Sequence, residues 1–189
     1  MSFKNLAKVR KLNDTNHQPV LILPGYGNSD EKHWQSLWED SHPNFKRVNQ
    51  TDWESPVCTD WVNALEKQIE QLGPNIKVVA HSLGCLLVAH WAAQTTLDIA
   101  GALLVAVPDP EGDNFPKKAL GFSPIPIVEF NFPSTIIASA NDPYSNMSFS
   151  KSCAKNWGCN LIELGDFGHI NSSSGLNNWP FGLDILRDL

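Results

Sequence analysis

The hydrophobic positions of the chain fall into short apolar runs rather than into an alternating pattern. The clearest runs are residues 20–23, 76–80, 101–108, 134–140 and 160–164. Continuous runs of this kind are typical of parallel strands that are covered on both faces, so each run predicts a buried strand. Residues 45–50 (FKRVNQ) add a shorter candidate strand between the first two runs.

Between these runs, apolar residues recur at the three- and four-residue spacing of a helix. The stripe over 59–72 has a capping residue at its start, Thr59 or Asp60, and Gly73-Pro74 at its end. Helices are expected over residues 33–40, 59–72, 83–95, 142–157 and 182–189.

Strands therefore alternate with helices, which predicts an α/β fold with a mostly parallel sheet and helices on both faces. Residues 108–133 interrupt this alternation with six of the thirteen prolines, so they are expected to be largely irregular, with room for one short helix. No repeat or linker marks a boundary. We expect a single domain over residues 1–189, with residues 1–16 at its periphery.

Charge and composition restrict what the protein is expected to bind and where it is expected to lie in the cell. The formal net charge of −6 does not indicate a surface for nucleic acid or anionic membranes. No run approaches the ~20 apolar residues that span a bilayer, and the N-terminal residues lack the apolar centre of a secretory signal, so a cytoplasmic protein is expected. Cys58, Cys85, Cys153 and Cys159 have no metal-binding spacing, which predicts free thiols and no metal site, with a Cys153–Cys159 disulfide as the alternative.

The candidate chemistry begins in VVAHSLGCLL, residues 78–87, where an apolar strand turns directly into an apolar helix. Ser82 lies at this turn, where the backbone N–H groups of a helix start are free to hold an oxyanion. Ala80 and Gly84 supply the small residues that such a turn needs, although the usual pattern is G-x-S-x-G. The alternative is that Ser82 merely caps a core helix. His81 is expected to point into the sheet or a loop and not to act as a base.

A nucleophilic serine needs an imidazole base and a carboxylate that orients the imidazole. Both follow in the order that this fold predicts, Asp142 after the run 134–140 and His169 after the run 160–164. His169 is the only histidine after residue 90. Asp166 and Asp109 remain the reserve candidates for the carboxylate, and Asp142 as a simple turn residue beside a proline remains the non-catalytic alternative.

A second oxyanion donor is expected from the loop after the first strand, LPGYGNSDEKHW. Gly25 and Gly27 allow the backbone of this loop to come close to the serine. We assign the backbone N–H groups of Tyr26 and Leu83 as the predicted oxyanion hole. The alternative is an ordinary glycine-rich turn, since the sequence pattern of a phosphate-binding loop is missing here.

The motifs LPGYGNSDEKHWQSLWE, VVAHSLGC, SANDPYSN and FGHIN together resemble the small serine hydrolases of the retinoblastoma-binding protein 9 / YdeN type. The resemblance runs from about residue 18 to the C-terminus. It implies a compact α/β-hydrolase fold without a large lid domain. It also implies Ser82 as nucleophile, Asp142 as acid and His169 as base.

The expected function is hydrolysis of a carboxylic ester or related small acyl substrate through an acyl-serine intermediate, without a cofactor. The same residues also suit a thioesterase, an amidase or an acyl transferase. A hydrolase-fold binding module with vestigial activity is the remaining alternative, and its partner surface would include His33, Trp34, Trp38 and Trp53.

Overall fold

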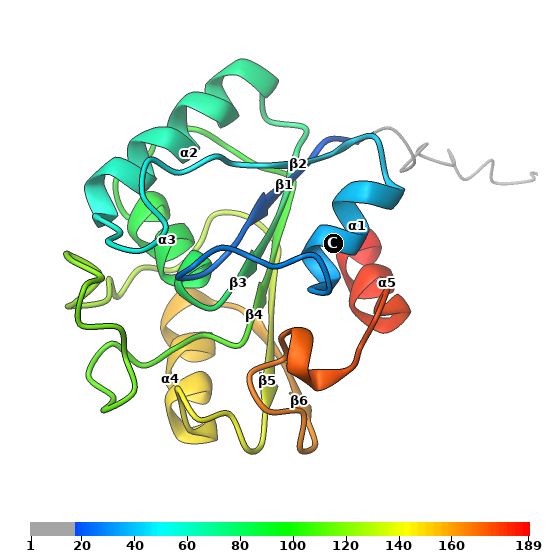
Figure 1. Ribbon diagram of the computed structural model, residues 1–189. Coiled ribbons are helices and arrows are strands. Elements are labelled where there is room, and N and C mark those ends of the chain that lie inside the picture. The colour runs from blue at the N-terminus through cyan, green and yellow to red at the C-terminus, as the bar shows by residue number, and fades with distance from the viewer. Residues whose placement is uncertain (1–17) are drawn as a thin grey trace, which may run out of the picture.

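In the computed structural model, which describes residues 18–189, a six-stranded sheet forms the centre of the molecule (Figure 1). All strand pairs are parallel, and the strand order is β2-β1-β3-β4-β5-β6. The strands are β1 (Val20–Leu23), β2 (Phe45–Arg47), β3 (Lys77–His81), β4 (Gly101–Val105), β5 (Ser134–Ser139) and β6 (Asn160–Leu164). The predicted peripheral segment, residues 1–16, lies outside the described residues.

Helices cover both faces of the sheet, as the sequence predicts. They are α1 (Trp34–Ser41), α2 (Cys58–Leu72), α3 (Leu83–Ala92), α4 (Met147–Trp157) and α5 (Pro180–Asp188). Figure 1 shows α2, α3 and α4 on one face, with α1 and α5 on the other. Among residues 18–189, no helix combines the length and the apolar composition that a membrane crossing requires.

Large aromatic residues fill the space between the sheet and each helical layer. Trp61 of α2 and Trp157 of α4 are fully buried on one face. Trp34 and Trp38 of α1 pack against Trp179 on the other face, with ring centroids 5.0 and 6.0 Å from it. Because each buried side chain of this size stabilises the fold by about 2–3 kcal/mol, these rings hold the helices on the sheet.

Long-range pairing changes some of the element boundaries that the sequence predicts. Helix α2 begins at Cys58, after an N-cap at Val57, and not at Thr59 or Asp60. The reason is that Val57 forms a bridge with Leu120, and the Cys58 N–H donates to the Leu120 carbonyl at 2.9 Å. Strands β2 and β4 and helix α3 also end earlier than the apolar patterns suggest.

The proline-rich segment between β4 and β5 contains neither a helix nor a strand, so the short helix that the sequence left open does not form there. The pairing of Leu120 with Val57 fixes its middle to the start of α2. Its first residues follow the carboxyl end of β4, so the segment passes beside the same sheet edge as the ends of β3 and β5.

The four cysteines are free thiols, so the alternative Cys153–Cys159 disulfide is not formed. Burial raises the pKa of Cys58 and Cys153 to about 12 and that of Cys159 to about 11. These groups stay protonated at neutral pH and have little thiolate reactivity.

The packing of α3 against β1 generates a stability prediction. A Cβ at Gly84 would lie 2.4 Å from the Leu23 carbonyl oxygen and 2.9 Å from that of Pro24. Because backbone atoms cannot move aside cheaply, we expect Gly84→Ala to lower the free energy of unfolding by about 1–3 kcal/mol. Urea denaturation measures this change.

The matched control is Gly165→Ala, because a Cβ at that position meets nothing within 4 Å. We expect its effect to stay within about 0.5 kcal/mol. Equal destabilisation by the two substitutions would contradict the proposed close approach of α3 to β1.

Candidate active site

Ser82 lies in a strained turn between the carboxyl end of β3 and the start of α3. Its φ of 53° and ψ of −122° are unusual for a residue with a side chain, and such strain costs about 1–3 kcal/mol. The turn is held because the Ser82 N–H donates to the Val105 carbonyl at 2.9 Å, and the Ser82 carbonyl accepts from the Cys85 N–H at 2.8 Å. The strand-turn-helix arrangement projects the hydroxyl above the sheet edge.

Small residues surround this turn where neighbouring chains come closest. A Cβ at Gly25 would lie 2.8 Å from the Cβ of Ser82, so the first loop can touch the serine only with glycine at this position. Ala80 lies within β3 and is fully buried, and its methyl group belongs to the apolar core on the face that α2 and α3 cover. The departure from G-x-S-x-G therefore does not disturb the turn.

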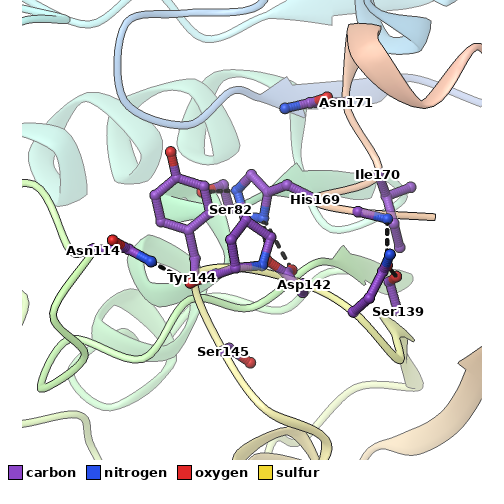
Figure 2. A network of polar contacts seen from close by, with 12 residues as sticks. Ser82, Asn114, Ser139, Asp142, Tyr144, Ser145, His169, Ile170 and Asn171 are labelled. Atoms are coloured by element: carbon purple, nitrogen blue, oxygen red, sulfur yellow. Dashed lines mark hydrogen bonds and ion pairs between the residues drawn. The ribbon is translucent and has the colours of Figure 1, made fainter. Parts of the chain in front are cut away.

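The structure brings Ser82, Asp142 and His169 together, although they are far apart in sequence (Figure 2). The Ser82 Oγ lies 2.8 Å from Nε2 of His169. Nδ1 of the same ring lies 2.9 Å from both carboxylate oxygens of Asp142. Because an ionised carboxylate only accepts hydrogen bonds, Nδ1 carries the proton and Nε2 is left to accept from the serine hydroxyl.

The two reserve carboxylates lie elsewhere. Asp109 accepts a hydrogen bond from the Glu111 N–H at 2.9 Å, and both carboxylate contacts of His169 Nδ1 are to Asp142, not to Asp166. Asp142 also accepts from the Tyr144 N–H at 2.9 Å, so it forms a turn as well as contacting the imidazole. Asp142 therefore fits both interpretations, as a turn residue and as the carboxylate that orients the imidazole.

Polar residues at the end of β5 hold the loop that carries His169. The Ser139 hydroxyl accepts from the Phe167 N–H at 3.0 Å, and the Asn141 Oδ1 accepts from the Gly168 N–H at 2.7 Å. The two side chains also contact each other at 3.0 Å. They fix the position of the imidazole relative to the carboxylate that follows the same strand.

Tyr144 is a further residue of the site that the sequence did not single out. Its ring lies beside the imidazole of His169, at 4.3 Å from centroid to centroid (Figure 2). Its carbonyl accepts from the Asp109 N–H at 2.9 Å. In the sequence, the only indication that Tyr144 belongs to the site is its position two residues after Asp142.

Two buried histidines lie behind His169. His81 places Nε2 2.8 Å from the backbone carbonyl of His169, so it donates to that carbonyl and supports the loop. The His33 and His81 rings meet edge to face at 4.7 Å, and those of His81 and His169 at 4.9 Å. The expectation that His81 points toward the sheet and loop region, away from the role of base, agrees with this geometry.

Burial keeps both supporting imidazoles neutral. Burial lowers the pKa of His33 to about 4, and it lowers the pKa of His81 well below its usual value, with the neighbouring histidines acting in the same direction. Nδ1 of His33 caps α1 by accepting from the Gln35 N–H at 3.1 Å, so Nε2 carries the proton. That Nε2 is buried and has no hydrogen-bond partner within the described residues.

The two backbone donors assigned to the oxyanion hole border the same pocket as the serine. The Leu83 N–H belongs to the first residue of α3 and has no acceptor within the helix. The Tyr26 N–H makes no hydrogen bond to another described residue. Gly27, with a φ of 74°, donates to the Trp53 carbonyl at 2.9 Å and anchors this loop.

The pocket beside Ser82 has a volume of about 220 Å³. It opens between the loop after β1, the proline-rich segment and the residues after His169. Of the aromatic residues considered for a partner surface, His33, Trp34 and Trp38 are at most 3% exposed. They belong to the core and the pocket wall, which argues against a partner surface on α1.

The family of this chain follows from a comparison with known proteins. Residues 20–188 match the family model described as serine hydrolase, so the chain belongs to that family. The curated protein YdeN of Bacillus subtilis (strain 168), named as a hydrolase, is 28% identical over 180 residues, which cover 88% of this chain and 93% of YdeN.

Solved structures agree with this assignment. A YdeN-like hydrolase from Pectobacterium atrosepticum is 29% identical, with a TM-score of 0.82 and coverage of 94% of this chain and 93% of that chain. The structure of the B. subtilis ydeN gene product gives a TM-score of 0.77 at 23% identity, and the match covers 90% of this chain and 97% of that chain. The YdeN-type resemblance and the α/β-hydrolase fold that the sequence predicts are confirmed.

The buried imidazole of His33 predicts a pH dependence of stability. The unfolded chain binds a proton on His33 near pH 6.5, and the folded chain binds it only near pH 4. The unfolded state therefore gains protons first, and the free energy of unfolding falls as the pH drops from about 6.5 to about 4. The contribution of this group is on the order of 3 kcal/mol.

His33→Asn tests the origin of this effect, because asparagine retains a capping acceptor for α1 but does not titrate. We expect a smaller loss of stability between pH 6.5 and pH 4 than in the wild type, measured by urea denaturation at each pH. Identical pH profiles for the two proteins would assign the acid sensitivity to other groups.

Proposed function

We propose that this serine hydrolase cleaves a carboxylic ester of a small acyl group through an acyl-serine intermediate. One observation carries the proposal: the Ser82 hydroxyl lies 2.8 Å from an imidazole nitrogen, and the other nitrogen of that ring lies 2.9 Å from a carboxylate. This arrangement suits transfer of the hydroxyl proton to His169 as the oxygen attacks a carbonyl carbon.

In the proposed reaction, the Ser82 oxygen forms a bond to the substrate carbonyl carbon while Nε2 of His169 takes the hydroxyl proton. The tetrahedral intermediate collapses, the bond to the alcohol breaks, and His169 returns the proton to the departing oxygen. A water molecule then repeats the sequence on the acyl-serine. Asp142 holds the imidazole in the productive tautomer and stabilises its positive charge.

The N–H groups of Tyr26 and Leu83 are proposed to bind the oxyanion. Each is free of an internal acceptor among the described residues and borders the pocket next to Ser82. Loss of one such donor typically costs about 2.7–4 kcal/mol of transition-state stabilisation. Gly25 makes this role possible because its missing side chain lets the loop approach the nucleophile.

Thioester or amide cleavage would use the same residues, and a panel of matched acyl substrates separates these reactions. A binding module with vestigial activity is disfavoured by the intact contacts between Ser82, His169 and Asp142. The backbone strain at Ser82 points the same way, since strained residues that persist cluster at functional sites.

The nucleophile is tested by Ser82→Ala. We expect hydrolysis of p-nitrophenyl acetate to fall by at least about 10⁴-fold, because the acyl-enzyme route is lost. We also expect the variant to lose covalent labelling by a fluorophosphonate probe that the wild type shows. Asp142→Asn should lower turnover by about 10⁴-fold through the wrong tautomer of His169.

Ser145→Ala is the matched control, because this nearby serine contacts Ser150 and lies away from the imidazole (Figure 2). It should retain both activity and labelling. Labelling that persists in a folded Ser82→Ala protein, or a wild type that never reacts with the probe, would argue against the proposed enzyme.

The size of the pocket predicts the acyl preference. A volume of about 220 Å³ bounded by Pro108, Phe115 and Pro116 leaves little space for a long chain. We expect kcat/KM to be higher for p-nitrophenyl acetate and butyrate than for the octanoate, because extra methylenes stay in water and gain no burial energy. Faster turnover of the octanoate would contradict a short acyl site.

A further inference from the structure

The two walls of the pocket differ in chemistry. One wall is apolar and comes mainly from the proline-rich segment, with Pro108, Phe115 and Pro116 beside Leu83. A second wall comes from the loop after β1 and from the residues that follow His169. It is lined by polar side chains: Asn28, Asp30, His33, Asn171, Ser172 and Ser173.

Asp30 gives the polar wall a negative charge. Its Oδ2 accepts from the Ser172 hydroxyl at 2.6 Å, and its Oδ1 accepts from the Lys32 N–H at 2.8 Å. The hydrogen bond from Ser172 lowers the pKa of Asp30, so this carboxyl group is ionised at neutral pH. These contacts also tie the loop after β1 to the loop after His169.

No lysine or arginine of residues 18–189 lines the pocket to balance this charge. Arg47 reaches the back of the same loop, where it donates to Asn28 Oδ1 at 2.6 Å and pairs with Glu39 at 3.0 Å. Burial keeps His33 and His81 neutral. Asp30 is therefore the only ionised side chain among the described residues that line the pocket, and near the polar wall its charge favours a cationic substrate group over an anionic one.

A second observation indicates that the polar wall receives a ligand. His33 lines this wall and is 3% exposed, yet its Nε2 has no partner within the described residues. Because its Nδ1 accepts from the Gln35 N–H, Nε2 is a donor without an acceptor. An oxygen atom of the substrate would complete it, so this observation indicates a ligand, and the charge preference rests on Asp30 alone. Buried donors are rarely left in this state unless water or a ligand completes them.

The position of the polar wall assigns it to one half of the substrate. The leaving alcohol must receive its proton from Nε2 of His169, so it lies on the side of that ring. Asn171, Ser172 and Ser173 follow His169 almost directly, and Ser172 is bonded to Asp30. The apolar wall is left for the acyl group.

We propose that the polar wall is a leaving-group subsite that selects alcohols carrying an ammonium group, with Asp30 as the specificity-determining residue. The inference rests on the ester hydrolysis proposed above and names the substrate class of the same site. An alcohol with a carboxylate or phosphate in that position is disfavoured by the same charge.

The test compares acetylcholine with 3,3-dimethylbutyl acetate, its neutral isostere, by titrating the acid released. At low ionic strength we expect wild-type kcat/KM to favour the cation by about fivefold, as for a partly screened charge pair about 6 Å apart. Added salt should reduce the ratio. Asp30→Asn should bring it to about one.

Asp184→Asn is the matched control, because it removes the same charge from an exposed residue of α5 that does not line the pocket. It should retain the wild-type ratio. A wild type that hydrolyses the neutral ester but shows no preference for the cation, or an Asp30→Asn protein that keeps the preference, would overturn the subsite while leaving ester hydrolysis intact.

Binding without turnover separates the two proposals. In Ser82→Ala, saturation-transfer NMR titrations should show choline binding about fivefold more tightly than 3,3-dimethylbutanol, and Asp30→Asn in that background should abolish the difference. If Ser82→Ala binds choline selectively but the wild type hydrolyses neither ester, the subsite is supported and the proposed reaction is refuted. Equal binding of both alcohols would refute the subsite.

Discussion

The close approach of three backbone segments at Ser82 is the constraint on which the rest of the site depends. The loop after β1, the end of β3 and the start of α3 meet there with no room for side chains at Gly25 or Gly84. This contact holds the serine in a conformation that its own φ and ψ preferences oppose. It also sets the direction of the hydroxyl and places Tyr26 and Leu83, the proposed oxyanion donors, along the same pocket.

The polar residues of the site form a layered support around His169. Asp142 contacts one ring nitrogen, and the end of β5 fixes the loop that precedes the ring through Ser139 and Asn141. His81 holds the backbone carbonyl of the same residue. Since burial keeps His81 and His33 uncharged, they place no like charge beside the imidazolium that the proposed reaction forms.

The sequence predicted the features that depend on local pattern and chain order. Apolar runs located the strands, and the positions of Ser82, Asp142 and His169 after successive strands placed them at one edge of the sheet. Features that depend on contacts between residues far apart in the sequence could not be predicted in this way. The start of α2 depends on a bridge to Leu120, and the link between Asp30 and Ser172 joins residues from opposite ends of the chain.

The two walls of the pocket come from separate parts of the chain, and this separation has an evolutionary consequence. The apolar wall belongs to a segment that carries no strand, and the bridge between Val57 and Leu120 anchors its middle. Insertions or replacements in that segment can accumulate without moving the strands that position the reacting side chains. If the two walls hold the two halves of the substrate as proposed, preference for the acid and preference for the alcohol are encoded in separate stretches of the sequence.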